Sequence, residues 1–420
     1  MIELIKDILL NTSGIDDWKI SEEKISSKEL FFVRTEMDMN RGKVVTKYTV
    51  TVYVDFNEDG KKYRGSTTIN IHPSMTTDEI KNAIDEGLFA AGFVKNEYYP
   101  IPSLDECLNG KHIEVNSNFS TGDISTSLSK LSNTMFNEDK YDNGGINSSE
   151  LFLNKIDTRI VNSQGIDVSY SRYSSMLEVV TDWKEDGEEV EIYKNIEFTQ
   201  YDEAFLSEEI VNMLKLSKQR AIANPTPEIK DCRILLTGEP VKEFFNYYYM
   251  NSNARLVYED ISTYKIGGNV QGENVCGDKI NLELVADLEN STETVPYDGS
   301  GFPLEDVEII KDGTLLRLWG DFRHSHYLNI KPTGNIKNFA VLGGSKSVSD
   351  MKKSPYIELI SFSDFQMDPL TGDFGGEIRL GWYYDGENTK PITGGSISGN
   401  ISNVAGEMYF SKEVQKLNNF

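Results

Sequence analysis

The chain has 420 residues and a formal net charge of −25, so it is long enough for two or three domains and too acidic to favour contact with nucleic-acid phosphates. Its apolar runs are far shorter than the roughly 20 residues that cross a bilayer, so we expect no membrane-spanning helix. The cysteines are few and odd in number, which indicates structural residues in a reducing, cytoplasmic compartment: Cys107, Cys232 and Cys276.

The first 95 residues combine helical and strand patterns. Apolar residues at helical spacing predict a helix over residues 2–11. Alternating apolar residues from Val44 to Val54, a turn at residues 57–60 and a second run over residues 63–71 predict a β-hairpin. Residues 76–79 form a capping box that predicts a second helix, ending near residue 92. This pattern indicates an N-terminal α+β domain with an antiparallel sheet.

A polar stretch rich in Ser, Asn and Asp follows, and residues 116–132 and 138–149 are predicted to be loops. Strand patterns return after residue 150, with a turn at residues 161–165. Apolar residues on one face predict a helix over residues 202–223, which Pro225 ends because proline lacks a backbone donor.

Strands and turns dominate after this proline, apart from one helix expected over residues 240–251. The sequence therefore predicts an α+β protein whose C-terminal domain is mostly β, a sandwich or a barrel-like fold. The predicted domains are residues 1–95, 96–224 and 225–420.

Two short motifs suggest metal binding but favour structural interpretations. The run from Asp55 to Gly60 matches the first half of a calcium-binding EF-hand loop, but Ser66 stands where a bidentate Glu is needed. His324 and His326 would share one face of a strand, yet no Cys or carboxylate at a recognisable spacing completes a zinc site. We therefore expect a hairpin turn and a structural histidine pair.

Three ordered blocks in the C-terminal half carry the most specific signal. They run from Val295 to Leu315, from Pro332 to Asn335 and from Asp368 to Asn400, and they are rich in Gly, Thr and Asn. Their order and spacing resemble the TldD/PmbA family. The turn at residues 161–165 and the N-terminal α+β unit also resemble that family, so the resemblance spans nearly the whole chain. It implies a subunit of a peptidase that trims unfolded or modified peptides, and the family is also described as a modulator of DNA gyrase.

One branch of this family carries H-E-x-x-x-H on a helix, where two His bind zinc and the Glu acts as a general base. The other branch, PmbA or TldE, lacks this motif and serves as the partner. In this chain Gly238 stands at the first His, Glu239 keeps the acidic position and Glu243 stands at the second His. The resemblance therefore implies a non-catalytic subunit without a metal or cofactor of its own, and zinc on a TldD-like partner.

Turns that combine Gly with Thr or Asn allow strands to bend and another backbone to approach closely. A peptide can then add to an exposed strand edge through main-chain hydrogen bonds. On this basis we expect eight residues to line a peptide chamber or a subunit interface: Thr333, Gly334, Asn335, Thr371, Gly372, Asp373, Gly399 and Asn400.

Three functions remain open at this point. The first is a non-catalytic subunit that assembles with a TldD-like zinc protease, or with itself, and admits peptides. The second is a stand-alone peptidase that uses a different site as a homodimer. The third is a protein that binds and modulates DNA gyrase, which the acidic charge permits because gyrase can offer a basic protein surface. Neither nucleic acid nor a membrane is an expected partner.

Overall fold

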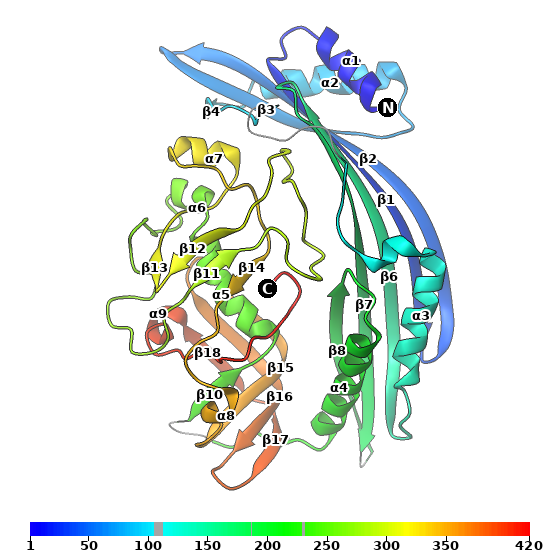
Figure 1. Cartoon of the computed structure of the whole chain (residues 1–420), viewed down its shortest axis with the longest axis vertical. Helices are drawn as coiled ribbons and strands as arrows, with labels where there is room; N and C mark the ends of the chain where they lie inside the picture. Colours follow the sequence, from blue (N-terminus) through cyan, green and yellow to red (C-terminus); the bar gives the residue numbers. More distant parts are fainter. Residues whose placement is uncertain (105–111, 186, 229–231) are drawn as a thin grey trace.

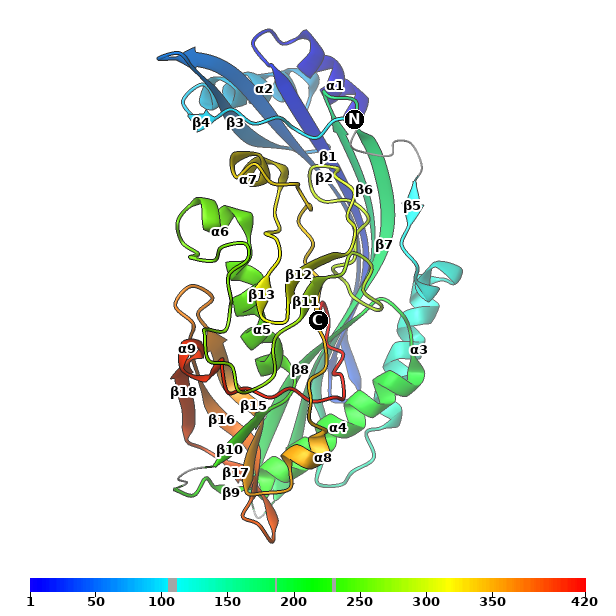
Figure 2. The same ribbon diagram turned by 60° about the vertical axis from the view of Figure 1, so that its left-hand side comes forward.

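The computed structural model describes residues 1–420 except 105–111, 186 and 229–231. It shows an α+β fold, which confirms the predicted class. One long, curved sheet forms one side of the molecule, and the C-terminal half packs inside its curvature (Figures 1 and 2). Cys107 lies outside the described residues, while Cys232 is partly buried and Cys276 is exposed, both as free thiols.

The long sheet follows the order β4-β3-β2-β1-β6-β7-β5, and β8 pairs with β7. Its central strands are antiparallel and unusually long, and the turn between β6 and β7 confirms the one expected at residues 161–165. Strands from both the predicted N-terminal and central domains share this sheet, and the division into two domains stays a prediction. The strands are β1 (Asp17–Val33), β2 (Glu36–Glu58), β3 (Lys61–Ile71), β4 (Asn96–Glu97), β5 (Ile113–Glu114), β6 (Gly144–Asn162), β7 (Asp167–Glu185) and β8 (Glu188–Phe198).

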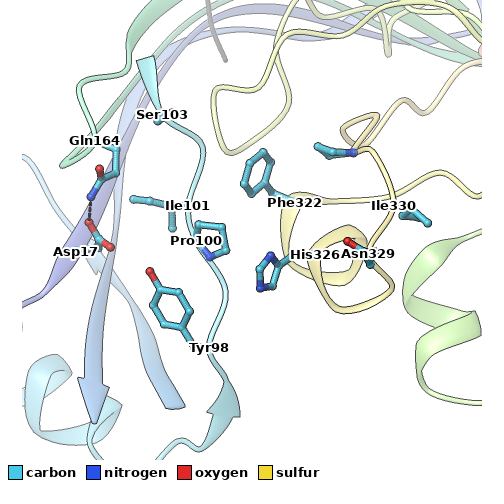
Figure 3. Close-up of a pocket in the computed structure, with 11 residues that line it drawn as sticks. Asp17, Tyr98, Pro100, Ile101, Ser103, Gln164, Phe322, His326, Asn329 and Ile330 are labelled. Carbon is cyan, nitrogen blue, oxygen red and sulfur yellow. Dashed lines mark hydrogen bonds between the residues drawn. The ribbon is translucent and has the colours of Figure 1, made fainter. Parts of the chain in front are cut away.

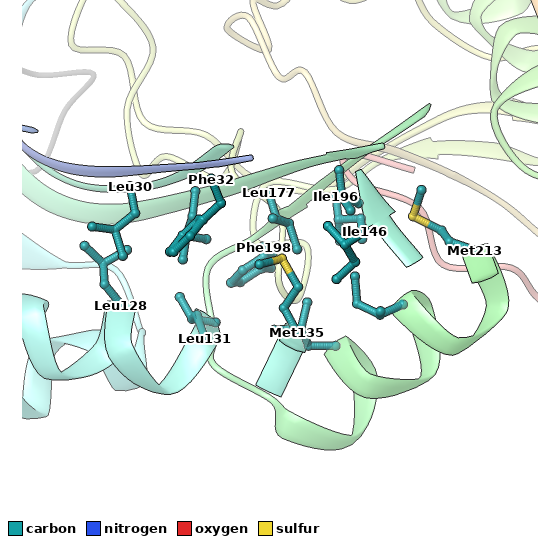
Figure 4. Close-up of a cluster of buried hydrophobic side chains, with 14 of the residues drawn as sticks. Leu30, Phe32, Leu128, Leu131, Met135, Ile146, Leu177, Ile196, Phe198 and Met213 are labelled. Atoms are coloured by element: carbon teal, nitrogen blue, oxygen red, sulfur yellow. The ribbon is translucent and has the colours of Figure 1, made fainter. Parts of the chain in front are cut away.

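Two pairs of helices cover the outer face of this sheet. Helices α1 (Ile2–Asn11) and α2 (Thr77–Ala91) pack on one end, and both confirm the sequence prediction, as does the capping box on α2. Helices α3 (Ile124–Asn137) and α4 (Glu203–Ala221) pack on the other end over a buried cluster (Figure 4). Alternation along the strands turns one set of side chains toward these helices and the other set toward the C-terminal half.

The prediction of loops over residues 116–132 and 138–149 is wrong for most of these residues. Helix α3 occupies residues 124–137, and β6 begins at Gly144. The serines along α3 hide a buried stripe of Leu128, Leu131 and Met135, and Asp123 caps the helix by accepting a hydrogen bond from the backbone N–H of Thr126. Tertiary packing of this stripe outweighs the low helix propensity of the polar residues.

The C-terminal half contains two open sheets, and in the described residues neither closes into a barrel. The larger has the order β10-β15-β16-β17-β9 with β18 on β16, and the smaller has the order β13-β12-β11-β14. The larger sheet consists of β9 (Asn224–Pro225), β10 (Arg233–Leu236), β15 (Tyr356–Met367), β16 (Asp373–Tyr384), β17 (Thr389–Thr393) and β18 (Ser396–Asn400). The smaller consists of β11 (Leu282–Leu284), β12 (Val307–Lys311), β13 (Thr314–Leu315) and β14 (Phe339–Val341).

Helix α5 (Glu239–Asn251) lies at the centre of this half, and the sequence predicted it. Its aromatic residues share one buried cluster with side chains of both sheets. The shorter helices lie around it: α6 (Ala254–Tyr258), α7 (Phe322–Tyr327), α8 (Val348–Met351) and α9 (Ile401–Val404), besides the 3-10 helix η2 (Asn118–Thr121) far away in the chain. Over the described ranges, none of the helices has the length and apolar character needed to span a bilayer.

Candidate functional site

The N-terminus of α5 is the position where the family resemblance expects a metal-binding helix. Gly238 precedes the helix with a φ of 73°, and its backbone N–H donates to Oε1 of Gln415 at 2.7 Å. The Glu239 side chain is 64% exposed and pairs with Lys242 at 3.5 Å, so it points to solvent. Glu243 is half-buried, and burial raises the pKa of its carboxyl group.

These residues do not fit a zinc ion. Helix α5 contains no His or Cys in its sequence. Neither of the two expected His positions, Gly238 and Glu243, carries an imidazole. Across the described residues, no group of three or more His, Cys, Asp or Glu side chains is arranged to hold a metal ion. What α5 does contribute is a row of aromatic side chains to the buried cluster of the C-terminal half.

The two neighbouring histidines lie on α7, so their predicted place on a strand is wrong. Residues two apart on a helix point about 200° away from each other, which separates the imidazoles. Nδ1 of buried His324 lies 2.9 Å from Oδ1 of Asp321, which caps the helix. Although burial favours the neutral acid, the hydrogen bonds from His324 hold the pKa of Asp321 below its usual value. His326 is exposed.

Of the predicted lining residues at 333–335, Gly334 and Asn335 lie next to the buried Asp298. The Oδ1 atom of Asp298 accepts the backbone N–H groups of Ser300 and Phe302 at 2.8 and 3.1 Å. Gly334 has a φ of 73°, and a Cβ there would lie 2.4 Å from Leu304. The Thr333 hydroxyl accepts the N–H of Gly320, and Asn335 lines a cavity of ≈ 270 Å³ near the end of α5. This turn is shaped by close packing.

The other five residues gather at the β15–β16 turn and the end of β18. The Thr371 hydroxyl donates to Asp373, and the side-chain amide of Asn400 donates to Asp373 and to the Thr371 carbonyl group at 2.8 and 3.0 Å. Gly372 packs against Tyr247 of α5, and Gly399 packs against the ring of Phe374. The structure thus forms two separate turns, of which the second packs against Tyr247 of α5. Their role in lining a chamber or an interface stays a prediction.

A cleft of ≈ 410 Å³ lies between the long sheet and α7 (Figure 3). Its residues come from β1, the segment after β4, the β6–β7 turn and the α7 region: Asp17, Tyr98, Pro100, Ile101, Ser103, Gln164, Phe322, His326, Asn329, Ile330 and Pro332. Asp17 is buried at its wall, where it accepts hydrogen bonds from Gln164 and Ser163 and pairs with Arg64 at 2.7 Å. The cleft thus presents amide, hydroxyl, imidazole and aromatic groups.

A partly buried lysine and a buried aspartate join the two halves near this cleft. The Lys19 ammonium group on β1 donates to the carbonyl oxygen of Gly299 at 2.9 Å, beside the buried Asp298. Burial lowers the pKa of Lys19 and raises that of Asp298. Sequence reasoning missed Asp17, Lys19 and Arg64, because nothing in their local patterns marks contacts with residues far along the chain.

Comparison with known proteins adds sequence and fold relatives. Residues 229–418 match the PmbA/TldA metallopeptidase C-terminal domain. An uncharacterized protein of Methanocaldococcus jannaschii is 24% identical over 273 residues, 61% of this chain and 62% of that protein. The metalloprotease PmbA of Escherichia coli O157:H7 is 25% identical over 138 residues, 32% of this chain and 31% of that protein. Each alignment therefore spans less than two thirds of the relative.

Solved structures share the whole fold. TldE from Thermococcus kodakarensis has a TM-score of 0.78 at 14% identity, covering 98% of this chain and 94% of that one. A proposed modulator of DNA gyrase from Thermotoga maritima has a TM-score of 0.77 at 15% identity, covering 96% and 93%. The C-terminal region of this chain therefore matches the PmbA/TldA family model, part of the chain is similar to PmbA, and the fold as a whole is that of TldE.

Proposed function

We propose that this chain is a non-catalytic subunit of a peptide-processing complex, in which a TldD-like relative carries the zinc. The observation that supports this proposal is α5, a helix that forms where the sequence resemblance expects the family's metal-binding helix, and whose residues Gly238, Glu239 and Glu243 offer no His or Cys ligand. A helix retained in the core without its metal ligands is expected of a scaffold whose partner performs hydrolysis.

The geometry also supports a role in holding peptides. The cleft beside α7 offers amide, hydroxyl and aromatic groups at the boundary of two layers, a common place for ligand sites. The turn at residues 371–373 brings Gly372 close to Tyr247 of α5, and the turn at residues 333–335 packs against Leu304 and Phe302. In the proposed complex this chain would complete the chamber and position an extended peptide, and water activation would belong to the partner.

Co-expression with the H-E-x-x-x-H relative tests this proposal. We expect the two chains to co-elute on size exclusion, and peptide cleavage to require both chains and zinc. The matched control is the relative with both zinc-binding His replaced by Ala, which should still co-elute but lose cleavage. Separate elution with full activity of the relative alone would contradict the proposal.

Two other functions make different predictions. A stand-alone peptidase would bind zinc stoichiometrically as the isolated chain and lose it on His324→Ala or His326→Ala. A gyrase modulator, the description carried by the Thermotoga protein, would change supercoiling in a gyrase assay. We also propose a cytoplasmic location, supported by the two described cysteines being free thiols.

A further inference from the structure

The middle of the outer face of the long sheet carries a group of hydroxyl, imidazole and carboxylate side chains. Helices α1 and α2 pack on one end of this face and α3 and α4 on the other, and β5 lies beside β7 between them (Figure 2). Ser169 and Ser171 are two residues apart on β7, so their side chains point to the same face. That face is the outer one, because Tyr173 of the same alternation belongs to the buried cluster under α3 and α4. His112 directly precedes β5, and its imidazole reaches both serines.

The imidazole of His112 bridges the two serines. Its Nδ1 lies 3.1 Å from Oγ of Ser169, and its Nε2 lies 3.0 Å from Oγ of Ser171. The Ser171 hydroxyl donates its one hydrogen to Oδ1 of Asp157, the residue directly opposite on β6. Oγ of Ser171 therefore accepts from His112, which places the ring hydrogen on Nε2 and leaves the lone pair on Nδ1. Ser169 donates its hydroxyl hydrogen to that lone pair.

This order of donors and acceptors prepares Ser169 to act as a nucleophile. A serine becomes nucleophilic when a base accepts its proton and a third group orients the base. Here Nδ1 of His112 is the base, and the Ser171 hydroxyl, held by the Asp157 carboxylate, orients the ring. When His112 takes the proton, the positive ring keeps its hydrogen bond toward this carboxylate. Ser171 is 3% exposed, so this end is fixed, whereas Ser169 is half-buried and His112 is exposed.

A cation lies on the same face beside this nucleophile. Arg159 on β6 is directly opposite Ser169, and its guanidinium group pairs with Asp167 at 2.8 Å and with Glu3 of α1 at 3.2 Å. Side chains directly opposite on antiparallel strands have Cβ atoms about 5 Å apart. A positive charge there favours the negative oxygen that forms when a carbonyl group is attacked. Because the imidazole is exposed, the site is open and suits a small ester.

We propose that Ser169 and His112 form an acyl-transfer site for small carboxylic esters. Oγ of Ser169 attacks the ester carbonyl carbon while its proton passes to Nδ1 of His112, and the ester C–O bond breaks as the leaving oxygen takes that proton. Water then attacks the acyl-serine carbon, and its proton passes through His112 back to Oγ as the acid departs. Ser171 and Asp157 are positioning residues. The site uses no residue of α5 or of the cleft beside α7, so it does not rest on the proposed function.

The first test treats the full chain with diisopropyl fluorophosphate, a small probe that loses fluoride when a serine oxygen binds its phosphorus. Peptide mass spectrometry locates the label. Ser169 should react at least about 100-fold faster than Ser129, since general-base assistance contributes about 10²–10⁴-fold. Ser129 is an internal control in the wild-type chain, because it is exposed on α3 and its hydroxyl donates to a backbone carbonyl. Equal labelling of the two serines, or labelling of Ser169 that His112→Ala does not slow, overturns the inference.

Hydrolysis of p-nitrophenyl acetate by the full chain tests the positioning residues. Ser169→Ala should abolish the turnover above buffer, while Ser129→Ala should leave it unchanged. Ser171→Ala should lower kcat by about 10- to 100-fold with little change in KM, because a misplaced base slows the reaction without touching the bound ester. Ser171→Thr should restore kcat by returning the hydroxyl. Full activity of Ser169→Ala or of Ser171→Ala contradicts the assignment. The assay contains neither zinc nor a second chain, so its result is independent of assembly with a zinc-bearing relative.

Discussion

The two halves of the molecule use their residues in different ways. The long sheet contains strands of 17, 23, 19 and 19 residues in β1, β2, β6 and β7, whereas the strands of the C-terminal half reach at most 12. Of the 33 glycines, 21 lie at or after residue 226, and many have positive φ or press against a neighbouring backbone. The regular alternation of side chains along long strands thus stabilises the first half. Irregular close contacts around α5 stabilise the second half.

The largest loss of stability should follow a substitution in the buried ionic cluster of the long sheet. This cluster interrupts the otherwise regular alternation of that sheet. Arg64 is buried and binds Asp17 at 2.7 Å and Asp55 at 2.6 Å. Arg64→Ala leaves two carboxylates without their main cation and should lower the free energy of unfolding by about 3–5 kcal/mol. Urea denaturation measures this change. Lys62→Ala is the control, because its side chain is 48% exposed and its pair with Asp55 should contribute under about 1 kcal/mol. Equal losses would contradict the comparison.

Glycine substitutions sharpen the description of the C-terminal half. Gly334→Ala and Gly372→Ala combine a positive φ with a Cβ placed 2.4 Å from Leu304 and 2.6 Å from Ile401. Each should cost about 2–4 kcal/mol of unfolding free energy, because strain and overpacking add. Gly394→Ala shares the positive φ but meets nothing within 4 Å, so it should cost only about 1 kcal/mol. Equal losses of unfolding free energy for all three substitutions would show that close packing contributes nothing beyond the positive φ at these turns.

The pH dependence of stability tests the boundary between the halves. Burial raises the pKa of Asp298 above the usual 3.8, so its neutral form stabilises the fold at low pH and this contribution is lost as pH rises through the raised pKa. The stability of wild type relative to Asp298→Asn should therefore fall with rising pH above 3.8, by at most about 1.4 kcal/mol per pH unit. Denaturation at several pH values measures this slope. Stability of wild type relative to Asp298→Asn that rises with pH above 3.8 would refute the assignment.

The smallest expected effect concerns the helix that the sequence did not reveal. Asp123→Ala removes the cap that accepts the Thr126 N–H at 3.0 Å and should lower the unfolding free energy by about 1 kcal/mol. Thermal denaturation followed by circular dichroism measures this loss. Asp123→Asn keeps an accepting oxygen and should recover most of the stability. No loss for Asp123→Ala would contradict this role of the cap and show that the stripe of Leu128 and Leu131 alone holds α3.

Sequence reasoning succeeded where one local pattern determines one element. The capping box at Thr76, the hairpin at residues 57–60 and the helix α5 all follow from short-range signals. It failed for α3, whose serines mask an apolar stripe, and for His324, which a capped single turn places on a helix. The cleft beside α7 was beyond its reach. Its walls come from segments far apart in the chain, and no local periodicity specifies such contacts.

The central claim is that α5 serves as a scaffold and that the zinc chemistry belongs to another chain. Metal analysis of the purified complex and of each separate chain, combined with a peptide cleavage assay, tests it most directly. We expect zinc and hydrolysis to follow the H-E-x-x-x-H relative, and this chain to bind no stoichiometric zinc while raising cleavage by the relative. Stoichiometric zinc in this chain alone, together with cleavage that Glu243→Gln abolishes, would contradict the account.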